Sequence, residues 1–186
     1  MGDISRGMLS AMVEIAVRPA RADDTGAVAR IHVEAWQATY PGFMPDEFLA
    51  NLSVERRRRH HEETLLLEDR ASFVGTVNGT VRGFATVGGA RHELGDVDVR
   101  DGWGELQAIY VHPDAHGFGL GSLLEAEGRA WLRDAGFRRA YLWVVSGNTQ
   151  AEVFYASKGW RPDGVRQIFE VPGADVPEHR LVIDLT

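Results

Sequence analysis

Apolar residues recur along this chain in two spacings, and their order predicts a mixed α/β protein. Runs that alternate or are almost wholly apolar indicate strands, whereas apolar positions three and four residues apart indicate helices. Proline and glycine separate these runs, as at Pro41-Gly42 and Asn78-Gly79. Strands are expected at 14–18, 71–77, 80–87, 105–111 and 140–145. Helices are expected at 24–39, 46–51, 54–67, 121–135 and 149–158.

The segments between these elements carry weaker signals. Asn78-Gly79 between two β-rich runs predicts a hairpin turn. Residues 88–104 are polar and acidic, so we expect a loop or a frayed strand extension, which is either an ordinary solvated loop or one that attracts a cationic acceptor. Residues 171–177 are expected to form the loop between the last two strands. Residues 1–13 lack periodicity, and we expect a flexible tail before a single domain at 14–186.

Composition narrows the class of protein. The 186 residues, 44% of them hydrophobic, suit one compact domain with a substantial core. The formal net charge of -7 argues against a nucleic-acid-binding surface. The absence of cysteine excludes disulfides, a thiol nucleophile and a thiolate metal site. No apolar run approaches the roughly 20 residues of a membrane span, and the first residues do not resemble a signal peptide, so we expect a cytoplasmic protein with no membrane partner.

The most informative stretch is 105–124. A strand-like run ends at Pro113-Asp114, and a turn with glycine at positions 117, 119 and 121 then opens an amphipathic helix. The first amides of a helix have no intrahelical partner, so such a turn can bind pyrophosphate, although it can also serve only to bend the chain. A P-loop is excluded because Ser122, with no lysine before it, follows Gly121. A dinucleotide-binding fold would place its glycine turn after the first strand.

Residues 106–124 resemble the acetyl-CoA-binding motif of the GNAT superfamily of N-acetyltransferases. The family pattern is a strand, then Gln/Arg-x-x-Gly-x-Gly/Ala, then a helix, and Gly119 and Gly121 fit its two small positions. His116 stands where Gln or Arg is usual, which leaves the amides in place but changes the side-chain contact to phosphate. A second match follows at the family's distance, where Asn148 comes just after a strand and the next helix ends in Phe154-Tyr155-x-x-x-Gly159-Trp160.

The resemblance implies a mixed, mostly antiparallel sheet of about six or seven strands flanked by helices. Its central strands, 105–111 and 140–145, would run parallel and splay apart, with helix 121–135 as the crossover. It also implies that acetyl-CoA is the co-substrate, with its pantetheine arm in the wedge between those strands and its pyrophosphate on the glycine turn. The implied cofactor-binding residues are Ile109, Tyr110, Val111, His116, Gly117, Phe118, Gly119, Leu120, Gly121, Ser122 and Asn148.

The resemblance further implies direct transfer of the acetyl group to an amine, with no metal. The amine attacks only when neutral, so a base or a water chain must take a proton, and Glu105 is the candidate base. Tyr155 holds the position of the family's tyrosine and would protonate the leaving thiolate. Each residue also has a structural interpretation: Glu105 as an exposed strand edge, Tyr155 as a half-buried core residue and Asn148 as a helix cap.

The acceptor is the least constrained part of the prediction. His32, Trp36 and Tyr40 share one helical face, so Trp36 and Tyr40 either line an acceptor pocket or form a plain packing face. The resemblance implies a primary amine of a small molecule or of a protein N-terminus. A non-catalytic acyl-CoA-binding or regulatory module of the same fold is the alternative function. A homodimer is the assembly that such a fold permits.

Overall fold

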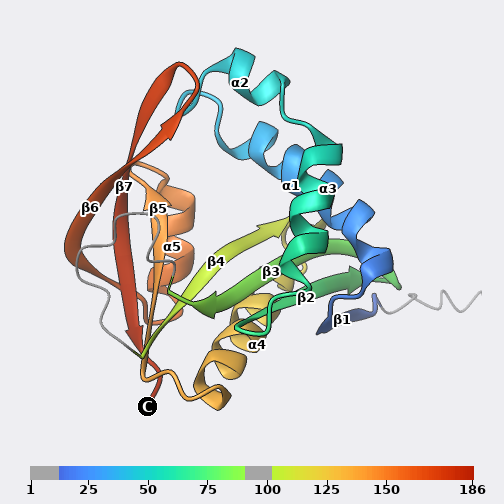
Figure 1. Ribbon diagram of the computed structural model, residues 1–186, viewed down its shortest axis with the longest axis vertical. Helices are drawn as coiled ribbons and strands as arrows, with labels where there is room; N and C mark the ends of the chain where they lie inside the picture. The colour runs from blue at the N-terminus through green and yellow to red at the C-terminus, as the bar shows by residue number, and fades with distance from the viewer. Residues whose placement is uncertain (1–12, 91–101) are drawn as a thin grey trace, which may run out of the picture.

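A computed structural model describes residues 13–90 and 102–186, and its centre is one twisted sheet (Figure 1). Within the described part of the chain, the sheet has seven strands in the order β1-β2-β3-β4-β5-β7-β6. The strands are β1 (Ile15–Pro19), β2 (Arg70–Val77), β3 (Thr80–Gly89), β4 (Trp103–Val111), β5 (Arg139–Val145), β6 (Arg161–Val171) and β7 (Ala174–Asp184). The helices are α1 (Thr25–Thr39), α2 (Asp46–Ala50), α3 (Val54–Thr64), α4 (Leu120–Asp134) and α5 (Thr149–Ala156), with short 3₁₀ turns at Ala22–Asp24 and Pro113–Ala115.

The first four strands form an antiparallel meander. Asn78 and Gly79 both have positive φ, 49° and 76°, and this is the turn geometry that matches the twist of a two-residue hairpin. The hairpin of β2 and β3 predicted from Asn-Gly is therefore confirmed. β1 pairs with β2, and β4 pairs with β3.

The central feature is the parallel pair β4 and β5. Only three residue pairs join them, from Trp103 opposite Arg139 to Glu105 opposite Tyr141, and the strands then separate. Beyond that point β5 continues in antiparallel pairing with β7 up to Val145. The predicted mixed, mostly antiparallel sheet with a splayed parallel pair is confirmed, and the separation opens a wedge between the two halves of the sheet.

Helices cover the two faces of the sheet unequally. α4 lies across β1 to β4 on one face, while α1 and α3 pack together on the other face (Figure 1). α4 comes close to the strands because Gly75 has no side chain: a Cβ there would lie 2.6 Å from Leu120 Cδ1. The core beneath α4 includes Leu120, Leu124 and Leu132, all of them almost wholly buried. Burial of these side chains stabilises the helix that follows the glycine turn.

Several predicted boundaries differ from the structure. α3 ends at Thr64, not at residue 67, and Leu66 beyond it is 81% exposed, so no core contact extends the helix. The segment 171–177 is not a loop: only Pro172 and Gly173 form the turn, and β7 begins at Ala174. β3 extends to Gly89 and β4 starts at Trp103, while the acidic residues of the predicted loop at 91–101 lie outside the described residues.

Two further predictions concern the N-terminal tail and the membrane. Residues 1–12 of the predicted tail are outside the described part of the chain. In the described part, no helix combines the length and the apolar character that crossing a membrane requires.

Candidate active site

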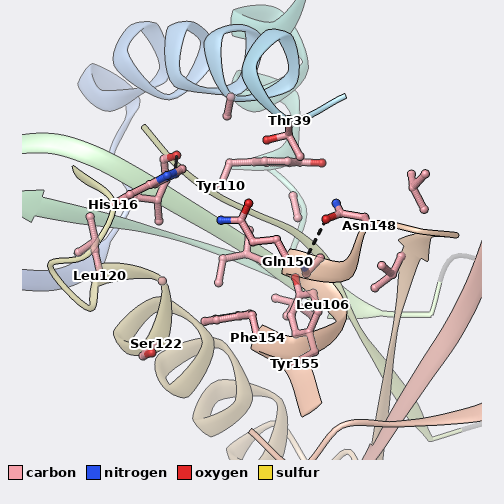
Figure 2. A pocket seen from close by; sticks show the side chains of 18 of the residues that line it. Thr39, Leu106, Tyr110, His116, Leu120, Ser122, Asn148, Gln150, Phe154 and Tyr155 are labelled. Carbon is pink, nitrogen blue, oxygen red and sulfur yellow. Dashed lines mark hydrogen bonds between the residues drawn. The ribbon is translucent and has the colours of Figure 1, made fainter. Parts of the chain in front are cut away.

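The wedge between β4 and β5 holds a cavity of about 490 Å³ (Figure 2). Its walls come from β4, β5, the start of α4, α5 and the end of α1. In Figure 2, Phe154 and Tyr155 of α5 lie across the cavity from Thr39 and Tyr110. The volume falls in the range of small-molecule sites, and the cavity brings the two sequence motifs together.

The β4 wall exposes a strand edge. β5 pairs with β4 only through Glu105, so the edge from Leu106 to Val111 faces the cavity while the other edge pairs with β3. Thr86 of β3 lies opposite Ala108 and Val87 lies opposite Leu106, so Gln107 is a bulge. Ile109, Tyr110 and Val111, predicted to bind the cofactor, all line the cavity. An extended amide-bearing arm could add to this edge as a strand does.

The glycine turn forms the next wall. Gly117 and Gly119 have φ of 85° and 79°, a conformation that residues with a Cβ rarely adopt. Gly119 precedes the first residue of α4, and the amides of residues 117–121 have no backbone acceptor among the described residues. A Cβ at Gly117 or Gly119 would meet no atom within 4 Å, so the space beside the turn is open. These unpaired amides at a helix N-terminus fit an anionic group such as pyrophosphate.

Two residues of the turn differ in their placement. His116 lines the cavity, but its Nε2 lies 3.1 Å from the carbonyl oxygen of Val111. Because a carbonyl only accepts, Nε2 carries the hydrogen and is directed to the strand end, which leaves Nδ1 as the second ring nitrogen. Phe118 is 41% exposed and is not among the residues that line the cavity. Gly117, Gly119, Leu120, Gly121 and Ser122 all line it.

Tyr155 is held rigidly on α5. Its ring contacts Phe154 and Trp160, with centroids 5.1 and 6.2 Å away, and it is only 8% exposed. Trp160 in turn donates a hydrogen bond of 2.9 Å from Nε1 to Oε1 of the buried Glu125 on α4. Burial raises the pKa of the Tyr155 hydroxyl above its ordinary value. The hydroxyl is therefore protonated at neutral pH and can serve as a proton donor.

Asn148 both caps a helix and lines the cavity, the two positions considered for it from the sequence. Its side-chain oxygen accepts a hydrogen bond of 3.1 Å from the amide of Ala151, which makes it the N-cap of α5. It also lines the cavity, as Figure 2 shows. With the oxygen committed to the helix, the side-chain NH₂ is the group available to a ligand.

Glu105 lies outside the cavity lining. It is 1% exposed, in the last residue pair that joins β4 to β5, so it is not the exposed strand edge of the structural interpretation. Glu105 is therefore not placed to touch an acceptor bound in this cavity, and its role as base stays a prediction.

Of the two residues predicted to line an acceptor pocket, Trp36 and Tyr40, one lines the cavity and the other does not. Tyr40 lines the cavity, and its hydroxyl lies 3.2 Å from that of Tyr110. Trp36 does not line the cavity; it is almost buried and contacts Phe48 and Phe169, while the Arg57 guanidinium lies 4.7 Å above its ring. Burial raises the pKa of both Tyr40 and Tyr110, so these hydroxyls are neutral. Trp36 therefore has the contacts expected of a plain packing face, which was the alternative to an acceptor pocket.

Sequence patterns missed several lining residues. Gln107, Trp143 and Gln150 also line the cavity, and they come from a bulge, from β5 and from the first turn of α5. The bulge leaves no local signal, because it arises from pairing with β3. Gln150 lies four residues before Phe154, and this helical spacing would have placed it on the motif face.

A splayed parallel strand pair, a glycine turn with unpaired amides and a buried tyrosine beside the gap are together consistent with a transferase of acyl groups. Comparison with known proteins agrees: the profile of the acetyltransferase (GNAT) family matches residues 26–160. The chain belongs to this family and is an acetyltransferase. Family membership favours an enzyme over the non-catalytic module considered from the sequence.

Individual relatives extend the match over most of the chain. The protein is 30% identical over 166 residues to the uncharacterized N-acetyltransferase YuaI of Bacillus subtilis, covering 88% of this chain and 90% of that one. It is 38% identical over 76 residues to the mycothiol acetyltransferase of Cellulomonas flavigena, a match covering 41% of this chain and 22% of that protein.

Among solved structures, the fold is similar to ribosomal-protein-alanine N-acetyltransferase from Brucella melitensis, with a TM-score of 0.72 and 23% identity over 91% of this chain and 99% of that one. It is also similar to PaiA N-acetyltransferase from Thermoplasma acidophilum in complex with coenzyme A, with a TM-score of 0.65 and 18% identity over 89% and 98%.

Proposed function

We propose that the protein is an acetyl-CoA-dependent N-acetyltransferase that moves the acetyl group directly to a primary amine of a small molecule or of a protein N-terminus. The observation that carries this proposal is the continuous cavity that joins the unpaired edge of β4, the amides of the glycine turn and Tyr155. This combination of a strand edge and unpaired amides suits a substrate with an amide-bearing arm and a phosphate end. YuaI, which matches over most of its length, is itself named an N-acetyltransferase.

In this proposal, main-chain groups make most of the contacts to acetyl-CoA. The pantetheine amides bond to the β4 edge at Ile109, Tyr110 and Val111, and the pyrophosphate lies on the unpaired amides of residues 117–121. The Asn148 NH₂ bonds to the pantetheine arm, since its oxygen caps α5. His116 stands where a guanidinium is usual and its Nε2 is directed to the Val111 carbonyl, so the backbone amides dominate recognition of the phosphates.

The chemistry follows from the same groups. The amine nitrogen, once neutral, attacks the thioester carbonyl; the C–N bond forms and the C–S bond breaks. Tyr155 delivers its proton to the departing sulfur, and the proton lost by the amine restores the hydroxyl through solvent. Main-chain N–H groups of β4 at the Gln107 bulge polarise the carbonyl oxygen.

Calorimetric titration of acetyl-CoA into the wild type and a Gly119→Glu/Gly121→Glu variant tests the cofactor site. The carboxylates would lie beside the phosphates and block the open turn, so we expect Kd to rise by about 100-fold or more. Gly164→Glu is the matched control, because Gly164 also has a positive φ, 89°, with no atom near its Cβ position. Equal loss in this control, or no binding to the wild type, would contradict the proposal.

A further inference from the structure

Tyr40 and Tyr110 form a hydroxyl pair on the α1 side of the cavity. The hydroxyl of Tyr40, the C-cap residue of α1, lies 3.2 Å from the hydroxyl of Tyr110 on β4, and both residues line the cavity. Each hydroxyl can donate one hydrogen bond and can also accept, and the bond between them uses only one of the two hydrogens. The hydroxyl pair therefore keeps both a donor and an acceptor for a ligand.

Aromatic packing holds the hydroxyl pair in place. The ring of His32 stacks on Tyr110, with centroids 5.2 Å apart and an interplanar angle of 22°, and Phe84 contacts the same ring at 5.7 Å. Trp36 meets the Tyr40 ring edge-on, with centroids 5.3 Å apart. Because these contacts fix both rings, a ligand that bonds to the hydroxyls does not have to order the two side chains, and this lowers the entropic cost of binding.

The side chains around the cavity suit a neutral amine better than an ammonium group. Among the described residues of the lining, those that can titrate are the hydroxyl pair, Tyr155 and His116. Burial raises the pKa of all three tyrosines, so their hydroxyls carry no charge at neutral pH. An ammonium group would lose its hydration with no carboxylate in this described lining to replace it, whereas a neutral amine loses much less.

We propose that the hydroxyl pair is the binding site of the acceptor amine, and that it favours weakly basic amines, such as a peptide α-amine, over strongly basic ones, such as a lysine side chain. This inference rests on the proposed function. The neutral amine donates an N–H to a tyrosine oxygen, which leaves its lone pair free to attack the thioester carbonyl. Tyr155 lies across the cavity from Tyr110 (Figure 2), so the amine and the proposed acid approach the thioester from opposite sides.

Other titratable groups surround the hydroxyl pair without taking its protons near neutral pH. Burial is the main cause of the raised pKa of Tyr110, while the Glu178 carboxylate of β7 adds to it and the Arg57 guanidinium of α3 opposes it. Burial also lowers the pKa of His32 well below its ordinary value, so the ring that stacks on Tyr110 is neutral. Tyr155 of α5, across the cavity, is protonated as well. A change of rate between pH 6 and 9 should therefore report on the amine.

Two amines test the selectivity: an alanine-starting tripeptide, with an α-amine pKa of about 8, and N-acetyl-lysine methylamide, with a side-chain pKa of about 10.4. Initial rates with acetyl-CoA from pH 6 to 9 give kcat/KM for each amine. The tripeptide profile should level off above about pH 8 and the lysine profile should still rise at pH 9, because each follows its own free base. At pH 7.5 the tripeptide should be preferred, since a roughly 100-fold larger fraction of it is neutral. Profiles with one shared apparent pKa, a preference for the lysine compound, or acetyl-CoA binding without transfer to either amine would overturn the proposal.

Phenylalanine variants test the binding site itself. Tyr40→Phe and Tyr110→Phe should each raise the KM for the tripeptide by about five- to tenfold, the effect of one lost hydrogen bond, with a smaller change in kcat. The acetyl-CoA Kd, measured by calorimetry, should stay within about twofold of the wild type. Tyr141→Phe is the matched control, because Tyr141 is fully buried outside the cavity lining, and it should leave the amine KM unchanged. An amine KM within about twofold of wild type in both Tyr40→Phe and Tyr110→Phe would overturn the proposal. A wild type that fails to bind acetyl-CoA would instead overturn the proposed function, and this inference with it.

Discussion

The two sides of the cavity are built on different principles. The proposed cofactor side comes mainly from one continuous stretch, β4 through the start of α4, which offers backbone amides and a strand edge, and Asn148 and Tyr155 add to it from the N-cap and body of α5. The proposed acceptor side is lined by Thr39 and Tyr40 at the end of α1, and behind them Trp36 packs against Phe48 of α2 and Phe169 of β6. Recognition by the backbone needs glycine and local geometry, whereas recognition by side chains depends on distant segments meeting.

This difference predicts where a substitution changes chemistry and where it changes packing. Tyr155, on the cofactor side, has a hydroxyl that is expected to reach the leaving sulfur. Tyr40, on the acceptor side, has a hydroxyl that already bonds with Tyr110 at 3.2 Å. Both tyrosines line the same cavity and both have a pKa raised by burial, so they form a matched pair.

Tyr155→Phe gives the largest expected effect. Removing the proton donor should lower kcat by about 100-fold, or about 2.7 kcal/mol in the activation barrier, while the KM for acetyl-CoA changes little. Tyr40→Phe removes one hydrogen bond and should lower kcat by no more than about tenfold. Steady-state kinetics on both variants measures the contrast. Equal losses in the two would mean that the sides of the cavity are not functionally distinct.

The same contrast explains what the sequence could predict. The glycine turn, the central strand and Asn148 are local patterns, and the structure places all of them on one cavity. The bulge at Gln107 and the exclusion of Trp36 from the lining depend on pairing and packing with segments distant in the sequence.

Acid should destabilise the fold through a buried histidine pair that joins α1 to α3. His32 of α1 and His61 of α3 are buried and bonded, with Nδ1 of His32 3.1 Å from Nε2 of His61. Burial lowers the pKa of His32 well below its ordinary value and that of His61 to about 4 from 6.5. The unfolded chain therefore binds more protons than the folded chain between pH 6.5 and 4, and stability falls as pH drops through that window.

Each histidine that titrates in this way contributes a slope of about 1.4 kcal/mol per pH unit. His61→Phe should remove the share of His61 from the pH dependence of the unfolding free energy, although it leaves His32 without its bonded partner. Denaturant unfolding at pH 5, 6 and 7 measures the slope. Arg59→Gln, an exposed change on the same helix, should leave the slope almost unchanged. An unaltered slope in His61→Phe would show that acid acts elsewhere in the chain.

Asn148 offers the smallest expected effect, because its oxygen caps α5 whereas its NH₂ is the group proposed to contact the cofactor. Asn148→Asp keeps the oxygen that caps α5 but removes the NH₂, whereas Asn148→Ala removes both. The alanine variant should lose about 1 kcal/mol of unfolding free energy, and the aspartate variant should lose almost none. Both should raise the KM for acetyl-CoA if the NH₂ contacts it. A normal KM in the aspartate variant would mean that Asn148 only caps the helix, and the cofactor side would then rely on backbone groups and Tyr155 alone.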